Sequence, residues 1–434
     1  MRVYIVGPLP AAIFLSLLWS RASDVGIAQH GLPSLALQLT VVLVGAALWR
    51  RLRGGERLGP MTFTTLFPYL PYLSVVSLSA LWSNVPDNAV NAAFDLLKNL
   101  LIFWVAVELL HSQPAYKAAC IALVLVAGTL SLLSIHQFIT GNFASDYGGF
   151  ALSPVRQIVD QLNSQRVAGP LGDPNFYALI LLVTVPLGLA LLQTQLPALL
   201  RLGLLAAVTA TAATVLLTYS RGGALVLGIG CLACLARWRM SRLHLAVVIV
   251  AVGASLAMLP SSVWDRLGTM LRAVQGTQAV GQLIDTSVEL RLGAQRVALE
   301  MFLDKPFVGI GAGNYPPLYP EYSQQLGVTA VASQFYPHNL YLQVLSETGA
   351  VGLLVFLPVV FGPLIELVRT RRVTKSISLD ASEWRELAFG TEVALGCYLL
   401  SSTMLHGSYP RYLWMLLALT VAAGRLAMTR GQVE

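Results

Sequence analysis

At Tyr336-Pro337-His338-Asn339-Leu340-Tyr341-Leu342-Gln343-Val344-Leu345-Ser346-Glu347-Thr348-Gly349, a long polar region of the sequence ends and an apolar run begins. We predict a helix that begins after Pro337. Its first turn would present free backbone N–H groups and the positive end of the helix dipole, which together suit an anion. His338 lies at this point, and an imidazole can gain or lose a proton near neutral pH. The stretch therefore predicts an anionic substrate that His338 faces.

The composition of the chain is that of a membrane protein. Hydrophobic residues make up 56% of the 434 residues and charged residues 11%, and the mean hydropathy is +0.68. A soluble protein of this size carries roughly a quarter charged residues. Runs of about 17 or more apolar residues recur, and each is long enough to cross a bilayer as a helix. We predict an all-α polytopic membrane protein. The four cysteines lie inside apolar runs and predict no disulfide framework.

Twelve apolar runs are predicted to span the membrane. They lie near residues 3–19, 31–49, 61–82, 88–110, 115–139, 175–193, 198–218, 222–236, 243–259, 340–368, 388–407 and 412–428. The first lacks a clear small-x-small cleavage site, so we expect a retained helix rather than a signal peptide. The chain then divides into residues 1–259 with helices 1 to 9, a loop subdomain at 260–339, and residues 340–434 with helices 10 to 12.

Lysine and arginine predict the orientation, because cytoplasmic connections carry an excess of them. Basic residues gather after the second, eighth and tenth spans, at residues 50–53, 237–242 and 369–375. Even-numbered connections and both termini are therefore predicted on the cytoplasmic side. The polar segments 140–174 and 260–339 then lie on the external side, and residues 288–302 have the pattern of an interfacial amphipathic helix.

Four arginines are predicted on the external side, where arginine is normally scarce: Arg166, Arg221, Arg291 and Arg296. Arg221 stands in Thr218-Tyr219-Ser220-Arg221-Gly222-Gly223, a hairpin so tight that the guanidinium must lie at the membrane face. Guanidinium groups bind phosphate oxygens through two parallel hydrogen bonds and stay charged at any relevant pH. We interpret the set as a cluster for a phosphorylated headgroup. Anchoring to lipid phosphates, or ion pairs with nearby carboxylates, is the structural alternative.

Two loops rich in glycine or proline are expected near the same face. In the stretch 166–175, Gly and Pro predict tight turns, Asp173 or Asn175 is expected to cap the next helix, and Arg166 can fold back over the site. The stretch Gly309-Ile310-Gly311-Ala312-Gly313-Asn314 lacks the context of a nucleotide-binding loop. Its glycines more simply predict a loop that passes close to other backbone.

Charged residues inside the predicted spans are few. Glu347 lies deeper in the helix that follows His338, and an intramembrane carboxylate is a functional candidate. The alternatives are that it pairs with an arginine or caps backbone groups that glycines loosen. Asp95 and Lys98 are one helical turn apart and are predicted to neutralise each other. No His, Asp and Glu set has metal-ligand spacing, so no metal site is predicted. Histidines near span ends are expected to be structural, namely His111, His244 and His406.

Taken together, these pieces resemble the O-antigen ligases, within the ligase/polymerase superfamily of bacterial surface polysaccharide assembly. Each motif is short, but their order and spacing extend the resemblance over nearly the whole chain. The matching motifs are Arg166-x-x-Gly169 with Asp173-Pro174-Asn175, Ser220-Arg221-Gly222, Arg291 ahead of Lys305-Pro306-Phe307-x-Gly309-x-Gly311, and His338-Asn339-x-Tyr341-Leu342-Gln343 leading to Glu347-x-Gly349.

The resemblance implies a GT-C-like glycosyltransferase at the periplasmic face of the bacterial inner membrane. It would move a polysaccharide from an undecaprenyl-pyrophosphate carrier to a sugar hydroxyl of the lipid A–core. It would use no nucleotide sugar, metal or other cofactor and bind no nucleic acid. His338 would be the general base, with Arg221 and Arg291 on the pyrophosphate and Arg166 as a third arginine. The residues expected in supporting roles are Asn339, Glu347, Arg296 and Tyr341.

The chemistry fits these residue types. Fixed guanidinium charges stabilise the negative charge that develops on a leaving pyrophosphate, and a neutral imidazole can take the proton of an acceptor hydroxyl. A single base and no evident enzyme nucleophile predict one displacement with inversion. Two alternatives stay open: a polymerase of the same superfamily, and a transporter or flippase of an anionic lipid. A transporter predicts charges spread through the membrane depth, which the sequence does not show.

Overall fold

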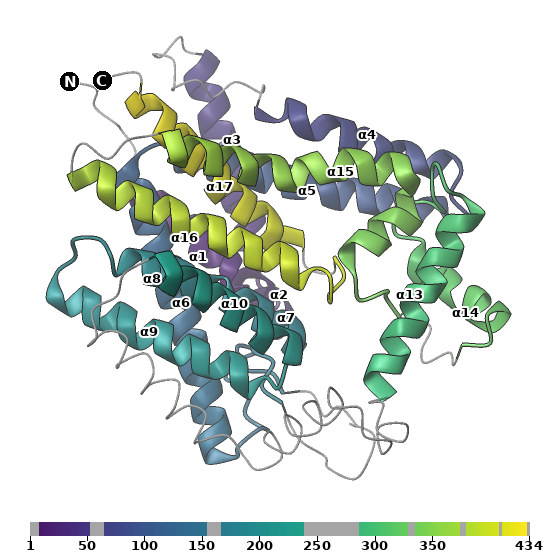
Figure 1. Ribbon diagram of the computed structural model, residues 1–434, viewed down its shortest axis with the longest axis horizontal. Helices are drawn as coiled ribbons and strands as arrows, with labels where there is room; N and C mark the ends of the chain where they lie inside the picture. The colour runs from purple at the N-terminus through teal and green to yellow at the C-terminus, as the bar shows by residue number, and fades with distance from the viewer. Residues whose placement is uncertain are drawn as a thin grey trace.

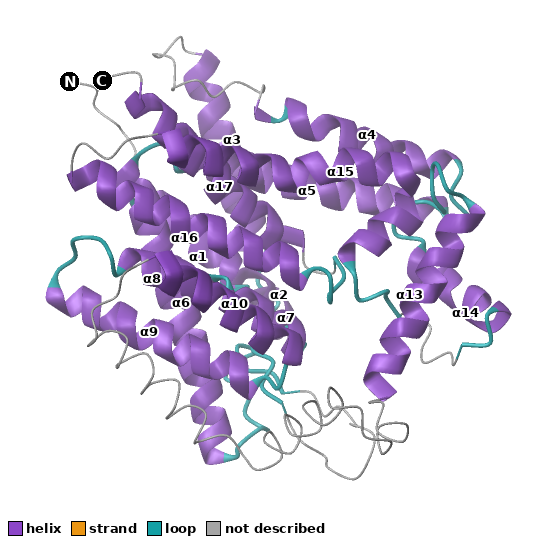
Figure 2. Cartoon of the chain, viewed as in Figure 1, coloured by secondary structure: helices purple, strands orange, loops and turns teal. Residues whose placement is uncertain are grey.

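The computed structural model describes residues 8–52, 65–153, 166–237, 286–328, 335–373, 379–407 and 410–431. Over these residues every regular element is a helix, in agreement with the predicted all-α class (Figure 2). The elements before the first long external segment are α1 (Leu9–Trp19), α2 (Ala22–His30), α3 (Leu35–Leu52), η2 (Phe67–Tyr69), α4 (Leu70–Leu78), η3 (Ser79–Leu81), α5 (Pro86–Leu109) and α6 (Gln113–Thr140). Those that follow are α7 (Pro174–Leu182), α8 (Thr184–Leu191), α9 (Ala198–Leu217), α10 (Arg221–Arg237), α13 (Thr286–Asp304), α14 (Tyr315–Gln325), α15 (Leu340–Val373), α16 (Leu379–Ser401) and α17 (Pro410–Gly431).

The apolar runs of the sequence are found as helices. Each predicted span corresponds to one or more helices, except the run at 243–259, which lies outside the described residues. Five helices, counting α7 and α8 as one span, are long and apolar enough to cross a membrane, and the bent pair α1 and α2 would make a sixth. The protein is therefore a polytopic membrane protein, while twelve spans and a GT-C arrangement remain predictions. The predicted span 388–407 ends early, because α16 stops at Ser401 and residues 402–407 form a loop.

The helices pack into one core through small residues. α6 lies against α1 and α9, and α17 lies against α5, α15 and α16 (Figure 1). At the contact of α6 with α9, a side chain on Gly128 would come within 2.5 Å of the Ala207 side chain. A side chain on Gly390 of α16 would likewise come within 2.4 Å of the Ala190 side chain of α8. Such small residues let helix backbones approach closely in a membrane, where the hydrophobic effect does not drive helices together.

Polar contacts join the connections that are predicted to be cytoplasmic. Lys117 donates to the Gln195 carbonyl oxygen at 3.0 Å and pairs with Glu383 at 3.1 Å. Arg237 and Glu386 pair at 2.8 Å. These residues flank the fourth, sixth, eighth and tenth connections, so the predicted even-numbered connections come together at one face of the bundle.

The odd-numbered connections come together in a second set of contacts. Trp82 Nε1 donates to the Val308 carbonyl oxygen at 3.2 Å, and the Leu340 N–H donates to the Ser402 carbonyl oxygen at 2.8 Å. The grouping of connections into two faces therefore follows the sequence prediction. The prediction that the odd-numbered connections lie on the periplasmic side remains a prediction.

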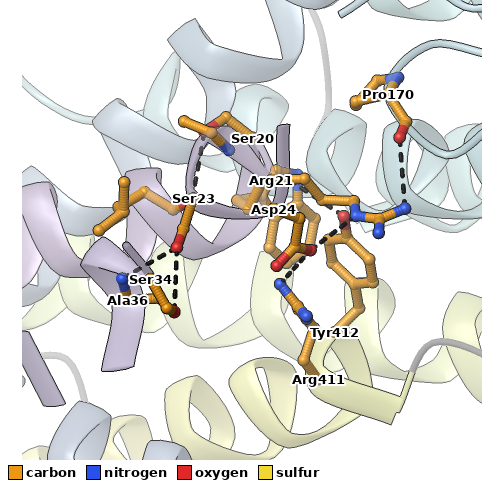
Figure 3. Close-up of polar contacts among 12 residues, drawn as sticks. Ser20, Arg21, Ser23, Asp24, Ser34, Ala36, Pro170, Arg411 and Tyr412 are labelled. Carbon is orange, nitrogen blue, oxygen red and sulfur yellow. Dashed lines mark hydrogen bonds and ion pairs between the residues drawn. The ribbon is translucent and has the colours of Figure 1, made fainter. Parts of the chain in front are cut away.

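An aspartate with two arginine partners ties three segments of the odd-numbered connections together (Figure 3). Asp24, just past the bend between α1 and α2, pairs with Arg21 at 2.8 Å and with Arg411 of α17 at 2.7 Å. Arg21 also donates to the Pro170 carbonyl oxygen at 3.3 Å. Pro170 lies four residues after Arg166, so the network holds the Arg166 segment against α2 and α17.

Residues 286–328 form a helical hairpin of α13 and α14 with a small core of its own. The predicted amphipathic helix at 288–302 lies within α13. The loop between the two helices fits against α15 where that helix breaks at Gly349. A side chain on Gly309 would come within 2.4 Å of the Glu347 backbone, and the Ile310 N–H donates to the Ser346 carbonyl oxygen at 3.0 Å. The predicted close approach of the glycine loop to other backbone is confirmed.

Candidate active site

A cavity at the face of the odd-numbered connections brings three of the predicted arginines together. About 690 Å³ of space, part of it open to solvent, lies between α7, α10, α13 and the loop after α16. Arg166, Arg221 and Arg291 line it. Arg296 does not line it and is exposed on α13. Three guanidinium groups from segments far apart in the sequence therefore surround one space.

Arg221 reaches the cavity because it is the first residue of α10 after a very short turn. α9 ends at Leu217, and Tyr219 takes a left-handed backbone with φ of 53°. Ser220 Oγ then accepts from the Gly223 N–H at 3.2 Å. A side chain on Gly223 would meet Ala178 of α7 at 2.8 Å, so the glycine lets α10 lie against α7. The tight hairpin predicted from the sequence is confirmed.

Arg166 folds back onto the same hairpin. Its Nε donates to the Thr218 carbonyl oxygen at 2.8 Å, and Nη2 lies 3.5 Å from Asn175 Oδ1. Asp173 caps α7, because its Oδ1 accepts from the backbone N–H groups of Asn175 at 2.8 Å and Phe176 at 3.3 Å. The predicted cap is therefore Asp173, while Asn175 lines the cavity beside the arginine.

His338 does not line the cavity, but its ring contacts the ring of His406. Its ring is 5.1 Å from the ring of His406, and residue 406 directly follows the lining residue Leu405. Phe335 contacts the His338 ring from another side at 5.2 Å. The backbone of His338 has φ of 47°, a left-handed conformation that is uncommon for a residue other than glycine. Such strained residues often occur at functional sites.

The prediction of free N–H groups at the start of α15 is wrong. Asn339 Oδ1 accepts from the N–H groups of Tyr341 at 3.0 Å and Leu342 at 3.1 Å, and the Asn339 carbonyl accepts from Gln343. The Leu340 N–H donates to Ser402. The first turn of the helix is thus capped by the protein itself. An anion in this region would be bound by arginine side chains instead of by the helix N-terminus.

Two other predicted supporting residues have structural contacts. Tyr341 donates from its hydroxyl to the Leu399 carbonyl oxygen at 2.9 Å and ties α15 to α16. Glu347 is buried and accepts from the Tyr315 N–H at 3.4 Å, with further hydrogen bonds from Gly313 and the Gln343 side chain. Its carboxylate therefore holds the start of α14 against α15, which is the capping alternative. Away from the site, Asp95 and Lys98 form the predicted ion pair.

His406 was predicted to be structural near a span end. It lies in the loop between α16 and α17, beside His338. Its ring stacks on Tyr336 with centroids 4.2 Å apart and planes 8° apart, and meets Phe176 edge-on at 5.0 Å. Burial above all, with His338 and Arg291 nearby, lowers the pKa of His406 to about 2. It is therefore neutral at any physiological pH.

The glycine loop provides a test of how the hairpin positions Arg291. Alanine at Gly309 should lower both thermal stability and activity. The position has φ of 69°, and an added Cβ would come within 2.4 Å of backbone. Gly327 is the matched control: it ends the same hairpin, has φ of 62°, and has nothing within 4 Å of a built Cβ. Thermal unfolding of the two purified variants measures the difference. Equal losses of stability would mean that the backbone contact is unimportant.

Comparison with known proteins finds one family model that matches part of the chain. Residues 205–357 match the family model described as O-Antigen ligase. The matched segment contains the Arg221 hairpin, Arg291 and His338, and it ends within α15. No curated protein matches the chain. The match over residues 205–357 supports the assignment of this protein to the O-antigen ligase family.

Proposed function

We propose that the protein is an O-antigen ligase of the bacterial inner membrane. It moves a polysaccharide from undecaprenyl pyrophosphate to a sugar hydroxyl of the lipid A–core at the periplasmic face. One observation carries the proposal: Arg166, Arg221 and Arg291 line a single cavity, and His338 contacts His406, which follows the lining residue Leu405. The family match supports the same reaction class.

The arginines account for the departure of the carrier. When the bond from the anomeric carbon to the pyrophosphate breaks, negative charge develops on the leaving oxygen. Preorganised positive groups in a partly desolvated site stabilise that charge more than water does. Guanidinium groups also fix the pyrophosphate through paired hydrogen bonds, which orients the anomeric carbon.

His338 accounts for activation of the acceptor. A sugar hydroxyl is a weak nucleophile, so a neutral imidazole takes its proton as the oxygen attacks the anomeric carbon. The new C–O bond forms as the bond to the pyrophosphate breaks. With one base and no enzyme nucleophile, the product has inverted anomeric configuration. Comparing the anomeric configuration of the transferred sugar in donor and product tests this step. Retention of configuration would rule it out.

Metal chelation gives a second test. We expect EDTA to leave the transfer rate unchanged, because guanidinium groups supply the positive charge at the cavity. Among the described residues, no three His, Cys, Asp or Glu side chains come together as ligands for an ion. The measurement is the initial rate in detergent with and without EDTA, followed by added Mg²⁺. Loss of activity that Mg²⁺ restores would revive a metal-dependent mechanism.

The deciding experiment separates the ligase from its alternatives. Purified protein is supplied with an undecaprenyl-pyrophosphate glycan and either lipid A–core or a second lipid-linked glycan as acceptor. A ligase joins the glycan to lipid A–core and releases undecaprenyl pyrophosphate. Product only with the second donor would identify a polymerase. Movement of the intact donor between leaflets of a vesicle, with no new glycosidic bond, would identify a flippase.

A further inference from the structure

The loop that carries His406 is fixed to the helix that follows His338. The Ser402 carbonyl oxygen accepts from the Leu340 N–H at 2.8 Å, and the Gly407 N–H donates to Gln343 Oε1 at 2.9 Å. Both ends of the loop are thus bound to the first turn of α15. In between, the loop presents Leu405 to the arginine cavity and His406 to His338.

His338 depends on its surroundings for its conformation. A left-handed backbone at a residue with a side chain is strained and persists only where neighbouring contacts enforce it. Phe335 and His406 meet the His338 ring at 5.2 and 5.1 Å. Of these two, His406 is itself held on two sides, flat against Tyr336 and edge-on to Phe176.

We propose that His406 is a positioning residue for His338. Its ring, held between Tyr336 and Phe176, sets the orientation of the His338 imidazole relative to the arginine cavity. The effect of this positioning on catalysis rests on the proposed function, since His338 is the base only in that reaction. Phe176 also directly follows the cavity residue Asn175, so the ring group joins the wall of the cavity to the base.

The electrostatics suit a positioning role. The titratable and charged groups that face His406 are His338, Arg291 and the Tyr336 hydroxyl. Burial above all, with His338 and Arg291 nearby, lowers the pKa of His406 to about 2, so His406 carries no proton on its second nitrogen. Of the two histidines, His338 is then the one that takes the proton from the acceptor hydroxyl. The pH dependence of the rate should therefore not come from His406.

Two substitutions separate the ring from its nitrogens. His406→Phe keeps a planar ring that can contact Tyr336, Phe176 and His338, whereas His406→Ala removes the ring. We expect His406→Ala to lower kcat roughly 10- to 100-fold, as small misplacements of a catalytic group do, with the donor KM unchanged. His406→Phe should keep most of the wild-type kcat and the same midpoint in the pH–rate profile. An equal loss in both variants, or a shifted midpoint in His406→Phe, would overturn the proposal.

A labelling measurement tests the positioning without relying on glycan transfer. Diethyl pyrocarbonate acylates accessible neutral imidazoles, and mass spectrometry follows its rate at His338 in the full-length protein in detergent. The rate should rise in His406→Ala and stay at the wild-type value in His406→Phe. An unchanged rate in His406→Ala overturns the positioning role. If wild-type protein transfers no glycan while the labelling changes as expected, the proposed function fails and the positioning role stands.

Discussion

Replacing His338 by alanine should abolish glycan transfer without removing donor binding. A general base contributes about 10²- to 10⁴-fold to a rate. His406 cannot substitute, because its lowered pKa makes it a very poor base. The arginine cavity is left intact, since His338 does not line it. The loss should therefore appear in kcat, with the donor KM close to wild type.

The measurement uses initial rates for the wild type, His338→Ala and His338→Gln with lipid-linked donor and lipid A–core. His111→Ala is a suitable control, because His111 lies between α5 and α6, in a connection of the opposite, even-numbered set. Circular dichroism and size-exclusion chromatography establish that each variant is folded. Undiminished transfer by His338→Ala would remove this residue as the base. A rise in donor KM with unchanged kcat would instead place it on the donor.

The local parts of the site could be predicted from the sequence because short-range rules determine them. The hairpin before Arg221 follows from Ser220 and two glycines between apolar runs, and the turn before α7 follows from Asp173 and Pro174. The error at α15 was also local. Asparagine is among the preferred helix N-caps, so Asn339 was a signal that the first N–H groups would be used by the protein itself.

That residues far apart in the sequence meet at one cavity could not be derived from local rules. Arg291 reaches the cavity only because α13 packs against α15, and that packing depends on the Gly309 loop and the Glu347 carboxylate meeting across the chain. The neighbourhood of His406 could not be predicted for a similar reason. It depends on where α16 ends, and an apolar run fixes a helix end only to within a few residues.

Replacing Arg291 should weaken both donor binding and turnover, and Arg296 offers a matched comparison on the same helix. Arg291 lines the cavity, whereas Arg296 is exposed and does not. A hydrogen bond to a charged group contributes about 1.5–3 kcal/mol, which corresponds to roughly 10- to 150-fold in an equilibrium constant. We expect a loss of this size for Arg291→Ala and little change for Arg296→Ala. Because negative charge grows in the transition state, kcat should fall further than binding.

The lysine variants test the geometry of the bound group. Arg221→Lys and Arg291→Lys keep the positive charge but cannot form two parallel hydrogen bonds to phosphate oxygens. They should bind a short-chain polyprenyl pyrophosphate more weakly than wild type and transfer glycan more slowly. Titration calorimetry with that ligand and with the matching monophosphate measures the preference. If lysine restored wild-type affinity, the arginines would act only as point charges, and if Arg296→Ala lost as much as Arg291→Ala, the ligand would lie outside the cavity.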